Sequence, residues 1–186
     1  HWHIHRGKKS LTLDLRTDEA QDVFRDLVRD ADAVIEAMRP GALARRGLGY
    51  EDLLEINPRL VFCTISGYGM TGPYANLPSH GIAYDTWAGI VNPTFNDDGF
   101  PYLPEHASIG IHAGPLFGAL GVLAGITKAR ATGEGSFLEI AQSDAAAAMD
   151  WLRSETWKAY ERPESEVTGN KADDYERRAP GTAGME

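Results

Sequence analysis

The chain has 186 residues, of which 42% are hydrophobic and 24% are charged, with a formal net charge of −9 at pH 7. This is the composition of a soluble globular protein with its own core, and the negative charge argues against a general nucleic-acid binder. The single cysteine, Cys63, excludes an internal disulfide and a cysteine-rich zinc site, which fits a reducing cytoplasm.

The chain opens on His1-Trp-His-Ile-His5, followed by the basic run Arg6-Gly-Lys-Lys9. The alternating histidines share one face of a strand if this segment is extended. No carboxylate or cysteine completes a metal-ligand set beside them, so we expect no metal. Arg6, Lys8 and Lys9 form either a solvated turn or a contact to phosphate, for which arginine and lysine are the natural donors.

The first half of the chain alternates between strand and helix patterns. In chain order it predicts a strand at 10–15, a helix at 18–30 capped by Thr17, a strand at 33–38, a short helix at 50–56 and a buried strand at 60–65. This order is typical of a parallel sheet with right-handed crossovers. We therefore predict an α/β fold with a Rossmann-like open parallel sheet and helices on both faces.

A glycine-rich run, Ser66-Gly-Tyr-Gly-Met-Thr-Gly-Pro73, follows the strand predicted at 60–65. Its glycines permit backbone geometries that other residues resist, and they let a ligand approach the main chain. Ligands of open parallel sheets bind at the carboxyl edge, where this loop lies. A glycine-rich loop alone is weak evidence, and no Gly-Lys-Ser/Thr follows to make a P-loop. Gly67 and Gly69 are the positions we predict to contact a ligand.

The second half of the chain begins with more loops. It predicts a helix at 82–90, a loop at 92–104, a helix opened by Gly114-Pro115 and ending at Arg130, and a polar linker or tail at 163–186. Gly118, Gly121 and Gly125 each cost about 1 kcal/mol against alanine in a helix interior, which indicates that another backbone lies against this helix. The longest weakly polar segment, Ala113 to Ile126, falls short of a bilayer span, so we expect no membrane segment.

The stretch from Ser136 to Ala148 carries the main functional hypothesis. An apolar run with Glu139 inside it predicts a buried strand, and four consecutive alanines predict a helix directly after it. Ser143 is in the position of an N-cap and Asp144 in the first turn, so a carboxylate lies at the carboxyl end of a strand, over a positive helix terminus. Such an aspartate is commonly only structural; the alternative is that Asp144 is a nucleophile.

Taken together, these segments resemble the family III CoA-transferases (the CaiB/BaiF family), which also include α-methylacyl-CoA racemases. The resemblance covers roughly Arg6 to Trp151 and rests on order, spacing and content together. The matching segments are 6–15, 34–50 with its Arg-Pro-Gly, 57–60, 66–74 with its Ser-Gly-Tyr-Gly-Met-Thr-Gly-Pro-Tyr, and 133–145 with its Gly-Glu-Gly and Ser-Asp-Ala.

The resemblance implies a reaction and the residues for it. Transferases of this family use an aspartate to attack an acyl-CoA thioester; an anhydride forms, CoA leaves and returns to give an aspartyl-CoA thioester, and a second acid takes over the CoA. Asp144 matches that nucleophile by its position in the motif. Contacts to the phosphates of coenzyme A, which is bound as a substrate, would fall on Arg39, Arg45 and the Arg6–Lys9 cluster.

Racemase members of the family use a histidine and an aspartate as opposed acid and base. His80 matches the histidine, but Gly110 stands where the aspartate would be, and only His112 could substitute for it. We therefore favour CoA transfer through Asp144. The alternatives are 2-methylacyl-CoA epimerisation with His80 as base, and a non-catalytic CoA-binding module, since a fold does not fix a function.

Members of this family are considerably longer than 186 residues, with an additional strand at the start and a second domain at the end. The resemblance implies that residues 1–162 form the Rossmann-like large domain without that first strand. Residues 163–186 would then lead toward a second domain, as part of a larger interlocked homodimer. The implied partners are an acyl-CoA and a carboxylic acid, in the cytoplasm, with no nucleic acid and no membrane.

Overall fold

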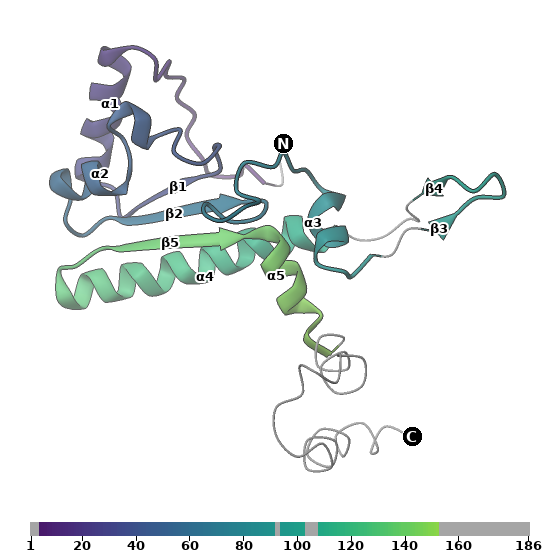
Figure 1. Ribbon diagram of the computed structural model, residues 1–186. Helices are drawn as coiled ribbons and strands as arrows, with labels where there is room; N and C mark the ends of the chain where they lie inside the picture. The colour runs from purple at the N-terminus through teal and green to yellow at the C-terminus, as the bar shows by residue number, and fades with distance from the viewer. Residues whose placement is uncertain (1–3, 92–93, 103–107, 153–186) are drawn as a thin grey trace.

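The computed structural model describes residues 4–91, 94–102 and 108–152 (Figure 1). In chain order the elements are α1 (Asp18–Arg29), β1 (Ala33–Glu36), the 3₁₀ helix η1 (Ala44–Arg46), α2 (Tyr50–Ile56), β2 (Val61–Ser66), α3 (Ile82–Trp87), β3 (Thr94–Phe95), β4 (Pro101–Tyr102), α4 (Ile109–Thr132), β5 (Ser136–Ala141) and α5 (Gln142–Met149). The linker predicted at 163–186 and the boundary predicted at 162 lie outside the described residues.

The main sheet has the strand order β1-β2-β5, and both pairings are parallel. β2 is the central strand, as its near-continuous apolar sequence predicts. Helices α1 and α2 lie on one face of this sheet and α4 on the other (Figure 1). The predicted α/β fold, with a parallel sheet between helices, is confirmed.

Two apolar clusters hold the layers together, because successive side chains of a strand point to opposite faces. Phe62 of β2 packs on the side of α1 and α2 with Val28, Leu53 and Leu60, all buried. Its neighbours Val61 and Cys63 face α4, where Val122 joins them. Cys63 has no exposed surface, so its predicted place in the core is confirmed.

The strand predicted at residues 10–15 is wrong. These residues have no regular secondary structure, and Leu11 is 63% exposed. Alternation of apolar and polar residues is not sufficient for a strand, because the backbone groups also need a partner strand. β1 is an edge strand of the described sheet and pairs only with β2. The helix that follows is as predicted: the Thr17 hydroxyl accepts the Ala20 N–H at 3.3 Å and caps α1.

Helix α4 begins five residues before the predicted start at Gly114, so Pro115 lies inside it. Proline has no backbone N–H and normally marks a first turn, which is why the sequence pattern misplaced the start. The true first turn is capped from another helix: the buried Asp85 carboxylate of α3 accepts the N–H groups of Ile109 at 3.0 Å and Gly110 at 2.6 Å.

The glycines of α4 let it lie close to the sheet. A Cβ atom at Gly125 would be 2.9 Å from Val61 Cγ1, and one at Gly118 would be 3.1 Å from Ile65 Cδ1. Strand side chains therefore fill these positions, not the second backbone that we predicted. A second backbone does approach α4 near its amino-terminal end, where a Cβ at Gly110 would be 3.2 Å from the Gln142 carbonyl oxygen.

Helix α4 has 24 residues, and an 18-residue window of it has a mean hydropathy of 1.7, so it is long and apolar enough to cross a membrane, contrary to our estimate of its apolar span. It packs along β2, β5 and α5, while Leu116, Leu120 and Leu123 are more than half exposed in the described structure. The predicted loop at 92–104 contains the small antiparallel hairpin of β3 and β4 in its described part.

Candidate active site

The junction of β5 and α5 lies at the carboxyl edge of the sheet. α5 begins at Gln142, directly after the strand, and its N-cap is Ala141, which has no polar side chain. The N-cap predicted at Ser143 is therefore wrong. Ser143 is instead a buried residue of the first turn, and its N–H donates to the Gly67 carbonyl at 3.1 Å. This bond continues the β2–β5 ladder into the first turn of the helix.

Asp144 lies in the first turn of α5, as predicted. Its Oδ1 accepts the Ser143 hydroxyl at 3.4 Å, and its side chain is exposed in the described part of the chain. The following residues, Ala145 and Ala146, are buried where α5 packs on α4 and α3. The carboxylate thus projects from a firmly seated helix, one residue away from the peptide group that is bonded to the loop after β2.

The glycine-rich loop after β2 is held in place by side-chain oxygens. The Gly69 N–H donates to Ser66 Oγ at 2.9 Å, and the Met70 N–H donates to the Glu139 carboxylate at 2.7 Å. Gly69 has a φ of 93°, in the left-handed region that favours glycine. A Cβ at Gly67 would overlap the hydroxyl of Ser79, so this glycine lets two loops meet.

A cavity of about 380 Å³ opens beside this loop, at the carboxyl ends of β1 and β2. Its wall includes the predicted ligand positions Arg39 and Gly67, together with Tyr68 and the first residue of α5, Gln142. Asp144 is not part of this wall but follows Gln142 by two residues. The structure thus brings together the segments after β1, β2 and β5 that the sequence singled out separately.

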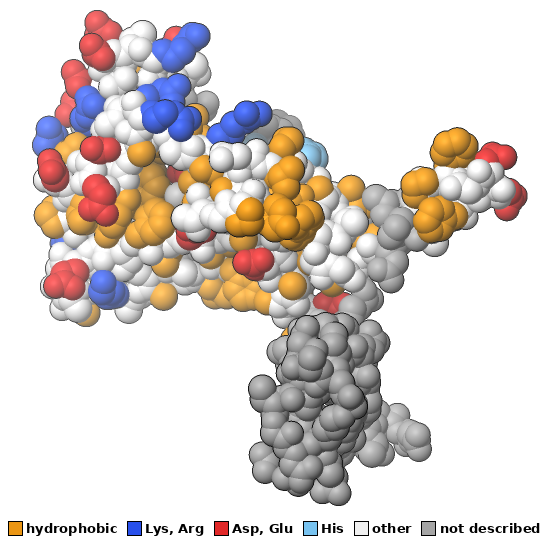
Figure 2. Space-filling model, in the orientation of Figure 1, with side chains coloured by type: hydrophobic (Ala, Val, Ile, Leu, Met, Phe, Trp, Pro, Cys, Tyr) orange, Lys and Arg blue, Asp and Glu red, His pale blue; other side chains and the backbone are white. Residues whose placement is uncertain are grey.

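An aromatic cluster flanks the cavity. The Trp87 ring packs against Tyr68 and Tyr74, with centroids 5.2 Å and 4.6 Å apart. Figure 2 shows hydrophobic side chains gathered over α3 and the loop before it, where Tyr74, Leu77 and Trp87 are about half exposed. Burial raises the pKa of the Tyr68 phenol, with a smaller contribution from Tyr84, so Tyr68 stays protonated at neutral pH.

The other predicted basic contacts are dispersed. Arg45 donates to the Pro40 carbonyl at 3.2 Å and lines a different cavity of about 530 Å³ with Arg16 and Arg46. Arg6, Lys8 and Lys9 are exposed on the segment before α1. Of the predicted phosphate contacts, only Arg39 lines the cavity at the carboxyl edge.

The predicted base His80 is exposed and lies just before α3. The position that would carry the opposing aspartate, Gly110, is buried: a Cβ there would be 2.7 Å from Tyr84 Cβ. A carboxylate could not be accommodated without moving α3. His112 is exposed on α4.

Sequence reasoning missed three residues that shape this edge. Glu36 accepts the Met38 N–H at 2.7 Å, and burial raises the pKa of its carboxyl while that hydrogen bond lowers it. Glu139 and Gln142 are the other two. The signal for Glu139 was visible, since it is a charged residue inside an apolar strand, but its partner is 69 positions away in the sequence.

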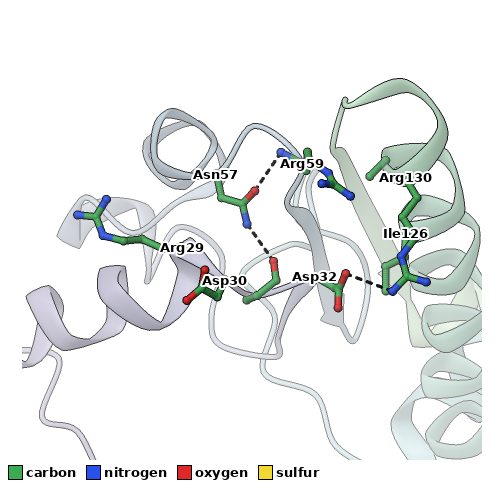
Figure 3. Close-up of a pocket in the computed structure, with 9 residues that line it drawn as sticks. Arg29, Asp30, Asp32, Asn57, Arg59, Ile126 and Arg130 are labelled. Carbon is green, nitrogen blue, oxygen red and sulfur yellow. Dashed lines mark hydrogen bonds and ion pairs between the residues drawn. The ribbon is translucent and has the colours of Figure 1, made fainter.

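A second cavity, of about 310 Å³, lies at the amino ends of the strands (Figure 3). Asn57 organises it by donating its amide to the carbonyls of Val28 and Ala31 at 3.0 and 2.9 Å, and Arg130 pairs with Asp32 at 3.6 Å. The Asn57 amide thus binds carbonyls at the end of α1, and the ion pair links the turn after α1 to α4. Because ligands of open parallel sheets bind at the carboxyl edge, we place the active site at the other cavity.

Known proteins are similar to this chain in sequence and in fold. The acetyl-CoA:oxalate CoA-transferase of Acetobacter aceti is 33% identical over 141 residues, which are 76% of this chain and 36% of that protein. The succinate–glutarate CoA-transferase of Agrobacterium fabrum is 36% identical over 144 residues, 77% of this chain and 36% of that protein. This chain therefore spans little more than a third of the length of these curated relatives.

A crystal structure of a CaiB/BaiF family protein from Brucella suis superimposes with a TM-score of 0.75 at 31% identity, covering 84% of this chain and 41% of that one. A crystal structure from Mycobacterium tuberculosis gives 0.75 at 29% identity, covering 85% and 44%. The family model of CoA-transferase family III matches residues 2–180. The resemblance drawn from the sequence motifs is thereby confirmed, and the chain belongs to CoA-transferase family III.

Proposed function

We propose that this chain provides the nucleophile of an enzyme that transfers coenzyme A from an acyl-CoA thioester to a carboxylic acid, with Asp144 in that role. Membership of CoA-transferase family III and relatives named as transferases support the reaction class. One observation carries the assignment of the residue. Asp144 follows Ser143, whose N–H is bonded to Gly67 in the wall of the carboxyl-edge cavity.

The proposed reaction keeps one high-energy acyl bond at every stage. The Asp144 carboxylate attacks the thioester carbonyl, and the CoA thiolate leaves as a mixed anhydride forms. The thiolate then attacks the aspartyl carbonyl of that anhydride, which releases the first acid and leaves an aspartyl-CoA thioester. The acceptor carboxylate then attacks this thioester, so that a second anhydride forms and the CoA thiolate leaves again. The thiolate attacks the acceptor's carbonyl in that anhydride, which gives the new acyl-CoA and frees the Asp144 carboxylate. The chemistry requires no metal and no redox partner.

A carboxylate is a weak nucleophile unless it is held in position and kept from water. The first turn of α5 supplies the position, because the buried Ala145 and Ala146 fix the helix against α4 and α3. Since the Asp144 side chain is exposed among the described residues, its shielding has to come from the bound acyl-CoA and from protein outside them. Arg39 in the cavity wall is placed to bind a phosphate or carboxylate group of a substrate.

The test is to incubate the protein with an acyl-CoA, quench the reaction, digest the protein and measure the mass of the peptide that carries Asp144. We expect an added acyl or CoA group on Asp144 and none in Asp144→Asn. Asp150→Asn, at the other end of α5, is the matched control and should be modified like the unchanged protein. Equal modification of Asp144→Asn, or none in the unchanged protein, would contradict the proposal.

The same incubation in deuterated water separates the alternatives. Epimerisation through His80 predicts deuterium at the acyl α-carbon without exchange of CoA between acids. A CoA-binding module predicts binding with neither reaction. The interlocked homodimer and the cytoplasmic location implied by the family resemblance stay predictions, which sedimentation and fractionation can check.

A further inference from the structure

Glu139 is the only charged residue of β5, the strand that leads into the helix of Asp144. Its neighbours Leu138 and Ile140 pack toward α4, so the alternation of the strand puts Glu139 on the opposite face. There its Oε1 accepts the Met70 N–H at 2.7 Å. Glu139 is exposed in the described structure, and its charge makes this bond stronger than one to a neutral acceptor at the same place.

The contact depends on Gly69. A Cβ at this position would be 3.2 Å from Glu139 Oε1, closer than nine in ten real Cβ contacts, so the carboxylate would have to move away. The residue is also buried and has a φ of 93°, so both space and backbone conformation favour glycine. Another hydrogen bond to this loop, from the Ser143 N–H to the Gly67 carbonyl, also comes from the β5–α5 segment. The loop after β2 is therefore fastened twice to the segment that carries Asp144.

We propose that Glu139 is a positioning residue of the transfer reaction. It fixes the loop at residues 66–70, whose first three residues line the carboxyl-edge cavity, to the strand that delivers Asp144. The inference rests on the proposed function, in which the substrate has to meet loop and carboxylate together. When the carboxylate is removed, the hydrogen bonds of Ser66 and Ser143 still hold Gly69 and Gly67, so the fold persists while Met70 loses its tie to β5.

The test compares Glu139→Ala, Glu139→Gln and the control Glu134→Ala in the full chain. Glu134 is an exposed residue in the turn before β5, at the opposite end of the strand. Two quantities are measured: hydrogen exchange of the Met70 amide, and the rate of Asp144 acylation at saturating acyl-CoA. Glu139→Ala should raise the exchange rate and slow acylation about tenfold, in keeping with the loss of one hydrogen bond to a charged group.

Glu139→Gln keeps an oxygen acceptor of the same reach, so it should recover most of the acylation rate, and Glu134→Ala should match the unchanged protein. The inference is overturned if Glu139→Ala leaves the Met70 exchange unchanged, or acylates at the normal rate. It is also overturned if Glu139→Gln is as slow as Glu139→Ala, since the carboxylate would then act through its charge. Normal acylation in Glu139→Ala leaves the proposed function intact. If the unchanged chain is not acylated, the proposed function is refuted. The exchange rate of the Met70 amide then decides by itself whether Glu139 fastens the loop.

Discussion

The seating of α4 on the sheet can be tested through Gly125 and Val61. A Cβ at Gly125 would be 2.9 Å from one methyl of Val61 and 3.0 Å from the other. Gly125→Ala gains about 1 kcal/mol of helix propensity but overpacks the core at a cost of about 1–3 kcal/mol. We expect the single change to lower the free energy of unfolding by about 0–2 kcal/mol.

Val61→Ala alone removes two buried methyl groups and should cost about 2 kcal/mol, from about 0.8 kcal/mol for each group plus a cavity contribution. In the double variant the nearest remaining atom is the Cβ of residue 61, at 3.6 Å, which is an ordinary contact. The new methyl on the helix then fills space that the valine left. The double variant should therefore lose only about 0–1 kcal/mol, a favourable coupling of about 1–4 kcal/mol.

Urea unfolding of the unchanged protein, both single variants and the double variant gives the four free energies, with the slope m as a check that the two-state description holds. Gly125→Ala combined with Ile56→Val is the control, since Ile56 packs in the cluster on the opposite face and the two changes should add. If the Gly125 and Val61 changes also add within about 0.5 kcal/mol, the helix is not seated on Val61 as the structure has it.

Three further predictions concern the two edges and the core. Gly114→Ala should slow the modification of Asp144 in the mass-spectrometric assay, because a Cβ there would be 2.7 Å from Gln142 Cγ and would push on the first turn of α5; an unchanged rate would contradict this. Asn57→Ala should lower the free energy of unfolding by about 1–2 kcal/mol in urea, because the carbonyls of Val28 and Ala31 lose its amide, although Val28 still accepts the Ala31 N–H; a loss below about 0.5 kcal/mol would count against it. Burial, aided by the charge of Glu36, raises the pKa of the Cys63 thiol above its ordinary 9.0. The folded state therefore holds this proton more tightly, and the free energy of unfolding should begin to fall as the pH rises above about 9, less steeply in Cys63→Ala; identical pH profiles for the two proteins would refute this.

Sequence patterns predicted the elements whose signal is local. The helix at 50–56, the strand at 60–65 and the strand around 137–141 follow from apolar runs bounded by turn residues, and the structure has them within a residue, although β5 is only partly buried and not the buried strand that we predicted. The strand predicted at 10–15 failed because alternation does not supply a pairing partner. The start of α4 was misplaced because its first turn is capped by Asp85, which lies in a different helix.

For the candidate site, too, the sequence predicted the local features and missed the contacts between distant segments. Asp144 and the glycine-rich loop could be placed at one edge because both follow strands of a parallel sheet. The cap predicted at Ser143 was wrong because the sheet ladder continues into α5 and engages the Ser143 N–H. The contact between Glu139 and Met70 could not be read from local sequence, since it depends on which two strands become neighbours.

That adjacency explains how the edge is assembled. The register places Ser66 of β2 opposite Ala141 of β5, so the glycine-rich loop and the helix of Asp144 leave the sheet at the same level. One residue of slip would move Asp144 by about 3.3 Å relative to the loop and turn Glu139 to the other face, away from Met70. The two strands are separated in sequence by α3 and α4, and α4 packs on both of them. The register between β2 and β5, across which α4 packs, therefore determines whether the glycine-rich loop and the Asp144 carboxylate lie next to each other.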